Sequence, residues 1–287
     1  MAGIIVLLLV ILPCQFACSD SPLRYIQNDA IKLGINLESG GAIGYFSLRA
    51  KDRNLLNRYD RGRFIQQSYY GDQDGSVWRD KPWCWNPVQG GDWQGNSAKI
   101  LASSFQADQL TIVTQPRHWA SGKLLTDTVM RMHVTLEGPV AHIKYSFHYK
   151  GHQAHARRAQ ELPAVFVDYA LPNLVFYRGD RPWQNALLTR LVPNWPNEYH
   201  SINEPWAAYV DEHDWGLGIY SERMSKLTCY RYRGDQKTGS MAAATSYLAP
   251  IEQLAIGPGF HLSYQASITI GKLNVIRARF YDLHQQN

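Results

Sequence analysis

Apolar and polar side chains alternate with a period of two along much of this chain. The clearest example covers residues 130–136 and, after Gly138 and Pro139, continues over residues 141–149. Because successive side chains of a strand point to opposite faces, this pattern predicts a hairpin with one buried and one wetted face. The same alternation predicts strands at 30–37, 110–113 and 262–270, and a second hairpin at 206–220 that turns at 212–215.

Segments with helical periodicity are missing from this pattern, and Gly and Pro punctuate the chain throughout. We predict no amphipathic helix of 12 or more residues, and therefore an all-β, antiparallel fold. Neither a linker nor a repeat interrupts residues 20–287, which we expect to form one domain. The longest irregular segments are expected to be functional loops, and they cover residues 72–98, 152–160 and 192–205.

The N-terminal segment resembles a signal peptide. Residues 1–19 are uncharged and contain an apolar run over residues 4–12, which is too short to span a bilayer. Ala17 and Ser19 fit the small residues that precede a cleavage site. We therefore expect a signal peptide at 1–19, a secreted protein, and no membrane association after cleavage. A lipoprotein anchor at Cys18 is the less favoured alternative.

Two cysteines, Cys84 and Cys229, follow the predicted cleavage site. In an oxidising compartment they are candidates for a disulfide, whereas two buried free thiols are an equally acceptable interpretation. The sequence leaves both open. With 45% hydrophobic residues, the chain is long enough to bury a large core without a disulfide framework.

The net charge of +5 comes from basic residues that are spread along the chain rather than grouped in a block. We therefore expect no nucleic-acid partner. A mild positive field would favour anionic partners such as uronic-acid or sulfated polysaccharides, although ordinary solubility charge is the favoured explanation.

Residues 59–92 combine aromatic rings with planar polar side chains at unusual density. Rings stack on the apolar faces of sugars, while guanidinium, amide and carboxylate groups read paired hydroxyls. The alternative is that these residues are half-buried on sheet faces. With Trp206, the predicted sugar-binding residues are Arg61, Arg63, Gln66, Gln67, Tyr69, Trp85, Asn86, Gln89 and Asp92.

Proton transfer at a sugar needs a carboxylate, histidine or tyrosine within hydrogen-bond reach. Glu161 and Glu204 each precede an apolar strand, His200 lies four residues before Glu204, and Tyr59 begins the aromatic segment. We predict these four as catalytic residues. Burial beside rings would raise the pKa of either glutamate toward neutrality. The predicted catalytic glutamates and the polar binding residues are expected to converge on one concave surface.

The sequence lacks complete motifs for metal binding, for a serine nucleophile and for phosphate binding. The run from Asp72 to Ser76 resembles a calcium loop, but residue 83 is Trp where a glutamate ligand is required. His152 and His155 have no partner ligand pair. No GxSxG nucleophile motif and no phosphate-binding loop occurs. We therefore predict no metal and no cofactor.

Three segments resemble the galactose mutarotase-like supersandwich, a two-sheet β fold of aldose epimerases, polysaccharide lyases and accessory domains of glycosidases. They read GGAIGYFSL, RNLLNRYDRG and SYLAPIEQLAIGPGFHLSYQASITIG. The resemblance implies a general-base glutamate in a Leu-Glu-Pro segment, but this chain has Ala249 at that position. Glu252 would lie on the other face of the strand.

We therefore favour a secreted carbohydrate-active enzyme, either a polysaccharide lyase or a glycosidase, with a carbohydrate partner. A non-catalytic glycan-binding module is the alternative, because the same residues could orient a sugar without reacting. An aldose epimerase is a lesser alternative.

Overall fold

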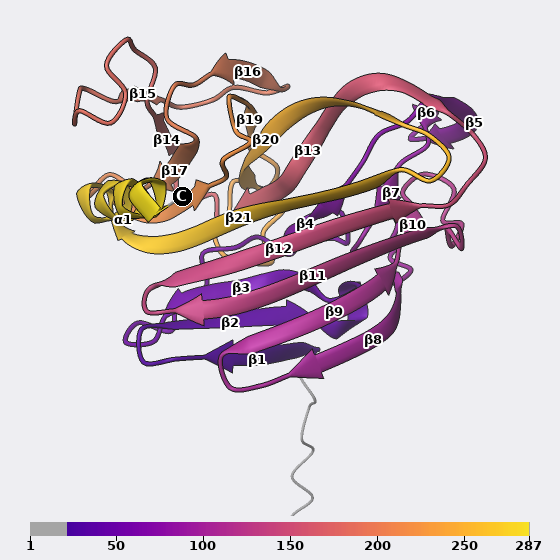
Figure 1. Cartoon of the computed structure of the whole chain (residues 1–287), viewed down its shortest axis with the longest axis horizontal. Helices are drawn as coiled ribbons and strands as arrows, with labels where there is room; N and C mark the ends of the chain where they lie inside the picture. Colours follow the sequence, from indigo (N-terminus) through magenta and orange to yellow (C-terminus); the bar gives the residue numbers. More distant parts are fainter. Residues whose placement is uncertain (1–21, 287) are drawn as a thin grey trace, which may run out of the picture.

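Two antiparallel β-sheets stack face to face in this protein (Figure 1). The computed structural model describes residues 22–286, so the predicted signal peptide lies outside the described residues. Over these residues the predicted all-β, antiparallel supersandwich is confirmed.

The first sheet has ten strands. Its main path runs in the order β1 (Leu23–Gln27), β2 (Ile31–Asn36), β3 (Ala42–Leu48), β4 (Ile65–Ser68), β13 (His155–Val167), β20 (Thr245–Ile256), β19 (Lys226–Tyr232) and β16 (Glu198–Ser201). Two short strands, β7 (Pro87–Val88) and β10 (Arg117–His118), attach beside β4. The strand β16 therefore forms one edge of this sheet.

The second sheet has nine strands. Their order is β15 (Thr189–Leu191), β14 (Asn173–Phe176), β17 (Trp206–Val210), β18 (Trp215–Tyr220), β21 (His261–Lys272), β12 (Val140–Tyr149), β11 (Thr128–Glu137), β9 (Gln109–Gln115) and β8 (Lys99–Phe105). The remaining elements are the hairpin β5 (Gln73–Trp78) with β6 (Lys81–Cys84), the 3-10 turn η1 (Leu37–Ser39) and the helix α1 (Leu273–Gln286).

The predicted hairpins form as the alternation requires. In β11 and β12 the register pairs Met132 with Tyr145, and both side chains are buried. Gly138 takes the turn with a φ of 48°, which a glycine adopts without steric cost. The second predicted hairpin is β17 with β18. Alternation predicted β11 and β12 well because each has one face in the core. By contrast, β17 is buried on both faces, since α1 covers its other side.

The principal core lies between the two sheets and includes Phe46, Phe147, Val165 and Leu248. A smaller core lies on the other side of the nine-stranded sheet, where Ile276 and other residues of α1 pack. Figure 1 shows this helix in yellow beside β17 and β21. Because strands of both sheets line the principal core, side chains on the opposite side of the ten-stranded sheet form a separate, outer face.

Two predictions about local structure were wrong. The chain contains a 14-residue helix, α1, which buries Leu273, Ile276 and Phe280 against β17 and β18. The segments expected to be irregular also contain strands: β5, β6 and β7 lie within 72–98, and β13 begins at His155. Pairing with partners distant in sequence forms β7 and β13, and a local pattern does not show such pairing. By contrast, β5 and β6 pair with each other as a local hairpin.

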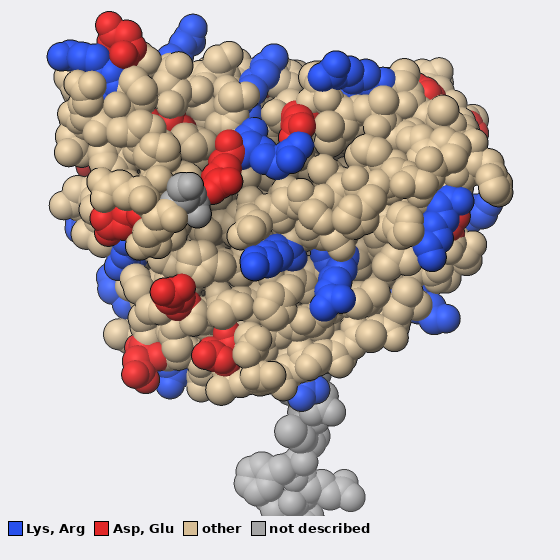
Figure 2. All heavy atoms as spheres, in the orientation of Figure 1, with Lys and Arg blue, Asp and Glu red and all other residues tan. Residues whose placement is uncertain are grey.

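Cys84 and Cys229 are both free thiols. No helix among residues 22–286 has the length and apolar character that a membrane crossing requires. Lys, Arg, Asp and Glu are scattered among uncharged residues on the face shown in Figure 2.

Candidate functional site

Glu161 lies on the outer face of the ten-stranded sheet. It belongs to β13, where its register partners are Ile251 on β20 and Ser68 on β4. After Glu161 the register of β13 shifts against both neighbouring strands. Tyr70 is held next to it, because the Gln160 side chain accepts a hydrogen bond from the Tyr70 backbone N and donates one to its carbonyl, each at 2.8 Å. The Tyr70 hydroxyl then donates to Glu161 Oε2 at 3.3 Å.

The protonation of Glu161 is strongly perturbed. Burial raises the pKa of its carboxyl from the ordinary 4.5 to about 7, and the hydroxyls of Tyr247 and Tyr70 offset this only in part. Burial also raises the pKa of both phenols well above 10, so both remain neutral. A carboxyl with a pKa near neutrality can both give and accept a proton at physiological pH.

An aromatic row lies beside Glu161 on this face. It consists of Phe166 on β13, Tyr247 on β20, Tyr230 on β19 and Trp195 in the loop before β16. Neighbouring ring centroids are 4.5, 4.5 and 4.8 Å apart. Tyr247 is buried, whereas Trp195 is 57% exposed. The aromatic row thus leads from the perturbed carboxyl to solvent, and its rings offer the flat faces on which sugars stack.

Arg63 and Tyr59 lie at the β13 end of the aromatic row. The Arg63 guanidinium is 5.9 Å from the Phe166 ring and 5.4 Å from that of Tyr59, which is half exposed. Arg63 donates to Asn57 Oδ1 at 3.2 Å and to the Ala243 carbonyl at 2.8 Å, which fix its plane. Its charge opposes the burial that raises the pKa of Tyr230, so the two groups are within electrostatic reach.

Of the predicted catalytic residues, Glu161 lies on this face and Tyr59 lies beside Arg63 at its margin. Glu204 does not lie on this face. Glu204 is fully buried beneath α1, away from the outer face of the ten-stranded sheet. Its carboxylate accepts hydrogen bonds from the Trp183 backbone at 2.7 Å, Trp206 Nε1 at 2.7 Å and the Tyr281 hydroxyl at 2.8 Å, and Arg277 lies 3.5 Å away. These partners occupy the Glu204 carboxylate, and Trp206 belongs to the smaller core beneath α1, so neither residue lies on the face that holds Glu161.

His200 also lies elsewhere. It pairs with Leu227 of the principal core, and its ring centroid is 5.3 Å from that of Phe176 on the opposite sheet. Paired residues of adjacent strands point to the same face. His200 therefore faces the interior of the sandwich, whereas Glu161 faces outward.

Most of the predicted sugar-binding residues are buried and bonded to the protein itself. Gln67 donates to the Arg131 carbonyl on the opposite sheet and accepts from Tyr69, whose ring packs 4.0 Å from Phe147. The ring of Trp85 stacks on that of His155 at 4.4 Å. Tyr69 and Trp85 therefore belong to the principal core, and Gln67 is buried beside Tyr69.

Other predicted sugar-binding residues form hydrogen bonds with backbone groups of the protein. Gln66 donates to the carbonyls of Arg61 and Arg63, and Asp92 caps the turn at residues 94–96. Gln89 donates to the Gly40 carbonyl at 3.3 Å. The expected convergence on one surface is therefore wrong for this group, since planar amides pair equally well with peptide groups. The Arg61 guanidinium is also bonded to the protein itself, because it donates to the carbonyls of Gly95 and Glu38 and to Ser39 Oγ.

Asn86 is buried but lies close to the site. Its side chain donates to Ser68 Oγ at 3.2 Å and to the Tyr69 carbonyl at 2.7 Å, and it accepts from Trp83 Nε1 at 3.2 Å. Because Ser68 is the register partner of Glu161, Asn86 supports the β4 side of the outer face. It is a positioning residue rather than one open to a ligand.

Sequence reasoning missed Tyr70, Phe166, Tyr230, Tyr247 and Trp195 as a group. They come from five separate segments, and the pairing of β13, β20 and β19 brings Phe166, Tyr247 and Tyr230 together. Alternation offered a partial signal, because Tyr247 and Phe166 each flank apolar residues that face the principal core.

A hollow of about 360 Å³ lies on the nine-stranded sheet next to α1 and is lined by His142, Tyr220 and Arg223 among others. Arg223 is already engaged, because both Glu252 oxygens accept from it at 2.6 Å. Burial lowers the pKa of His142, which leaves the imidazole uncharged at neutral pH. This hollow lacks the combination of acid and exposed rings found around Glu161.

Comparison with solved structures identifies the fold. A galactose mutarotase related enzyme from Lactobacillus acidophilus is 10% identical, with a TM-score of 0.55 over 86% of this chain and 97% of that one. A galactose mutarotase-like protein from Lactobacillus casei is 12% identical, with a TM-score of 0.55 over 86% and 99%. Another from Clostridium acetobutylicum is 8% identical, with a TM-score of 0.51 over 86% and 94%.

The chain thus has the galactose mutarotase-like fold, as its sequence motifs predicted. No family model matches the chain, and no curated protein matches it in sequence. At such low identity the likeness extends to the fold alone, and function has to be argued from the site itself.

Proposed function

We propose that this protein binds a carbohydrate on the outer face of the ten-stranded sheet and moves a proton on it with Glu161. The observation that supports this most strongly is the carboxyl whose pKa is raised to about 7 next to a row of aromatic rings that ends in solvent. Strongly perturbed acids cluster at functional sites.

The roles follow from the contacts. Glu161 is proposed as the general acid or base, and the Tyr70 hydroxyl as a neutral donor that stabilises its ionised form. Trp195 and Tyr230 are proposed to stack against the sugar. Arg63 is proposed as a positioning residue, because its guanidinium is largely covered and bonded to protein oxygens.

A single carboxyl favours elimination or epimerisation over hydrolysis. Glycosidases use two carboxyls about 5 to 9.5 Å apart. Besides burial, the charges of two carboxylates, Glu161 and Asp60, raise the pKa of Tyr230, so Asp60 is the second carboxylate near the aromatic row. Asp60 is engaged by the Gly62 backbone at 2.9 Å and lies 3.6 Å from Arg63 Nε. We therefore propose a lyase-type or epimerase-type reaction ahead of the glycosidase that composition also allowed.

The position of Ala249 is consistent with this proposal. The resemblance to aldose epimerases implied a general base there, and Ala249 packs with Tyr247 and Ala164 on the outer face. Glu161 projects from the neighbouring strand onto the same face. A carboxyl on β13 would then replace the one that β20 lacks.

A non-catalytic glycan-binding module is the second candidate. It is favoured by the exposure of Trp195 and of Tyr199, which is 55% exposed on β16. We also propose that the protein acts outside the cytoplasm, which the composition of residues 1–19 supports.

The test is a screen of neutral, uronic and sulfated sugars with the full chain. Optical rotation reports epimerisation, ultraviolet absorbance reports unsaturated products, and reducing ends report hydrolysis. We expect turnover in one of the first two assays. Turnover only in the third would favour a glycosidase, binding without turnover would favour the binding module, and neither would overturn the carbohydrate proposal.

A further inference from the structure

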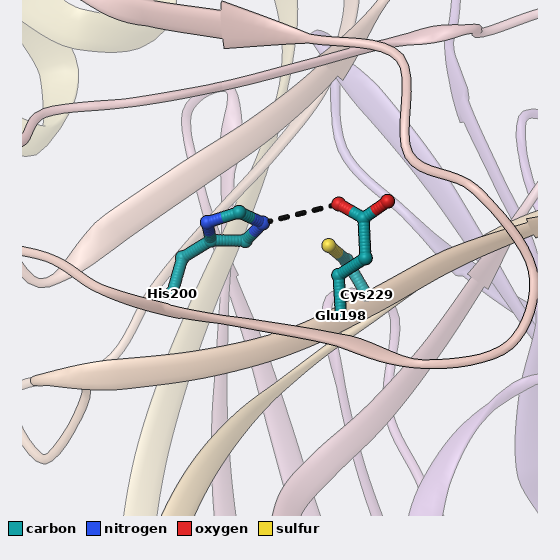
Figure 3. Close-up of side chains that lie close together, drawn as sticks. All are labelled: Glu198, His200 and Cys229. Atoms are coloured by element: carbon teal, nitrogen blue, oxygen red, sulfur yellow. Dashed lines mark hydrogen bonds and ion pairs between the residues drawn. The ribbon is translucent and has the colours of Figure 1, made fainter.

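Three side chains with different ligand chemistry meet at the edge of the ten-stranded sheet. Glu198 and His200 lie two residues apart on β16, and Cys229 on β19 is the register partner of Glu198. All three point to the inner face of the sheet, because Cys229 and the His200 partner Leu227 belong to the principal core. Figure 3 shows the imidazole and the carboxylate side by side, with the thiol close to the carboxylate.

The spacing of these groups suits a small cation. His200 Nε2 is 3.3 Å from Glu198 Oε2, and the ligand atoms of all three residues lie within 4.8 Å of one another. In tetrahedral zinc sites the Zn–S distance is about 2.3 Å and the Zn–N and Zn–O distances about 2.0–2.2 Å, which puts neighbouring ligands about 3.3–3.7 Å apart. The nitrogen and oxygen already have this separation. The sulfur lies no more than 4.8 Å from either atom, so it needs to approach by at most about 1.3 Å.

The carboxylate is oriented by groups outside the cluster. Asn194 donates to Glu198 Oε1 twice, from its backbone N at 2.8 Å and from Nδ2 at 3.0 Å. This leaves Oε2 turned toward His200. Hydrogen bonds of this kind, which fix a ligand in place, accompany most protein metal sites.

Access to the cluster is graded. Cys229 is fully buried, whereas the side chains of His200 and Glu198 are 19% and 28% exposed. A cation could therefore enter past the edge strand and keep a water molecule as its fourth ligand. Three protein ligands plus water is the arrangement of zinc sites that retain an open position.

We propose that Glu198, His200 and Cys229 form a zinc site. The mixture of thiolate, imidazole and carboxylate selects Zn²⁺ over Ca²⁺ or Mg²⁺, which prefer oxygen ligands alone. On binding, the Cys229 thiol loses its proton to solvent and the sulfur bonds the metal. The ion would join β16 to β19 and, through Asn194, hold the loop that contains Trp195. The inference does not depend on Glu161.

The experiment uses the full chain after treatment with a chelator, titrated with Co²⁺ as a spectroscopic substitute for Zn²⁺. We expect a thiolate-to-cobalt charge-transfer band at one equivalent, which Zn²⁺ removes by competition and Ca²⁺ does not. Cys229→Ser should abolish the band. Asn194→Ala should weaken metal affinity roughly 10- to 100-fold, the usual effect of losing a hydrogen bond to a ligand.

The matched control is Cys84→Ser, since Cys84 is also a free thiol but lies outside this cluster. It should retain the band. Zn²⁺ should also raise the unfolding temperature of the wild type and of Cys84→Ser. If Cys229→Ser does not fold, His200→Gln on the exposed edge strand replaces it, and it should lower the affinity at least tenfold. No band in the wild type, a band that survives Cys229→Ser, or an unchanged affinity in His200→Gln would overturn the proposal.

Discussion

Glu161 should make the stability of the protein depend on pH in a way that its removal eliminates. In the folded protein, burial raises the pKa of this carboxyl to about 7 from an ordinary value of 4.5. The folded state therefore holds the proton at pH values where the unfolded chain has released it. The contribution of Glu161 to the free energy of unfolding is therefore complete below about pH 4.5. It falls as the pH rises toward 7, because the unfolded state binds fewer protons over that range.

The magnitude follows from linkage. Between pH 5 and pH 8, a carboxyl with these two pKa values loses about 2.5 kcal/mol of folding free energy. In Glu161→Gln the side chain keeps its shape but does not titrate. The variant should thus gain about 2.5 kcal/mol relative to the wild type on going from pH 5 to pH 8.

Urea unfolding of both proteins at pH 5 and pH 8 measures this difference, and every other titrating group cancels between them. Glu222→Gln is the control, because Glu222 is exposed and its replacement should leave the pH dependence unchanged. A change below about 0.5 kcal/mol between the two pH values for Glu161→Gln would refute the reasoning, since an unperturbed carboxyl gives that result.

Three further predictions test the rest of the description. Glu204→Ala should destabilise the protein by about 3–5 kcal/mol in urea unfolding, because it leaves a buried cation and several donors unpaired; a loss under 1 kcal/mol would contradict its structural role. Trp195→Ala should weaken sugar binding about tenfold or more in calorimetric titration, because a stacking surface is lost, and unchanged affinity would remove the aromatic row from the site. Gly216→Ala should cost about 1–3 kcal/mol, because its Cβ would lie 2.0 Å from the Tyr209 carbonyl oxygen. Gly257→Ala, with open space around it, should be neutral, and equal thermal shifts for both would contradict the packing.

The longest hairpin of the fold was predictable because each of its two strands has one buried face. The alternation at Met132 and Tyr145 is a direct consequence of a sandwich with a single interior between its sheets. The buried residues of α1, Leu273, Ile276 and Phe280, do have helical spacing, but apolar Val275 on the exposed side weakens the contrast between its faces. Such a helix is stabilised by the sheet it covers rather than by its own periodicity.

The candidate site was only partly predictable. Glu161 was identified because a polar residue that leads into a buried strand is unusual, yet the same argument applied to Glu204 and failed there. What separates them is the partner set: a buried arginine and three donors surround Glu204, whereas phenols and an open aromatic row surround Glu161. Partners distant in sequence cannot be read from local pattern. The Glu198, His200 and Cys229 cluster was missed for the same reason, since strand register alone joins β16 to β19.

The most direct test of the central claim compares sugar turnover by wild type and Glu161→Gln at saturating sugar, using the reaction that the screen identifies. Glutamine keeps the shape and hydrogen bonding of the side chain but cannot exchange a proton. We predict that kcat falls about 10²- to 10⁴-fold, as for loss of a general acid or base, while the Kd for the sugar changes less than about threefold. A variant that turns over the sugar at the wild-type rate would contradict the role of Glu161.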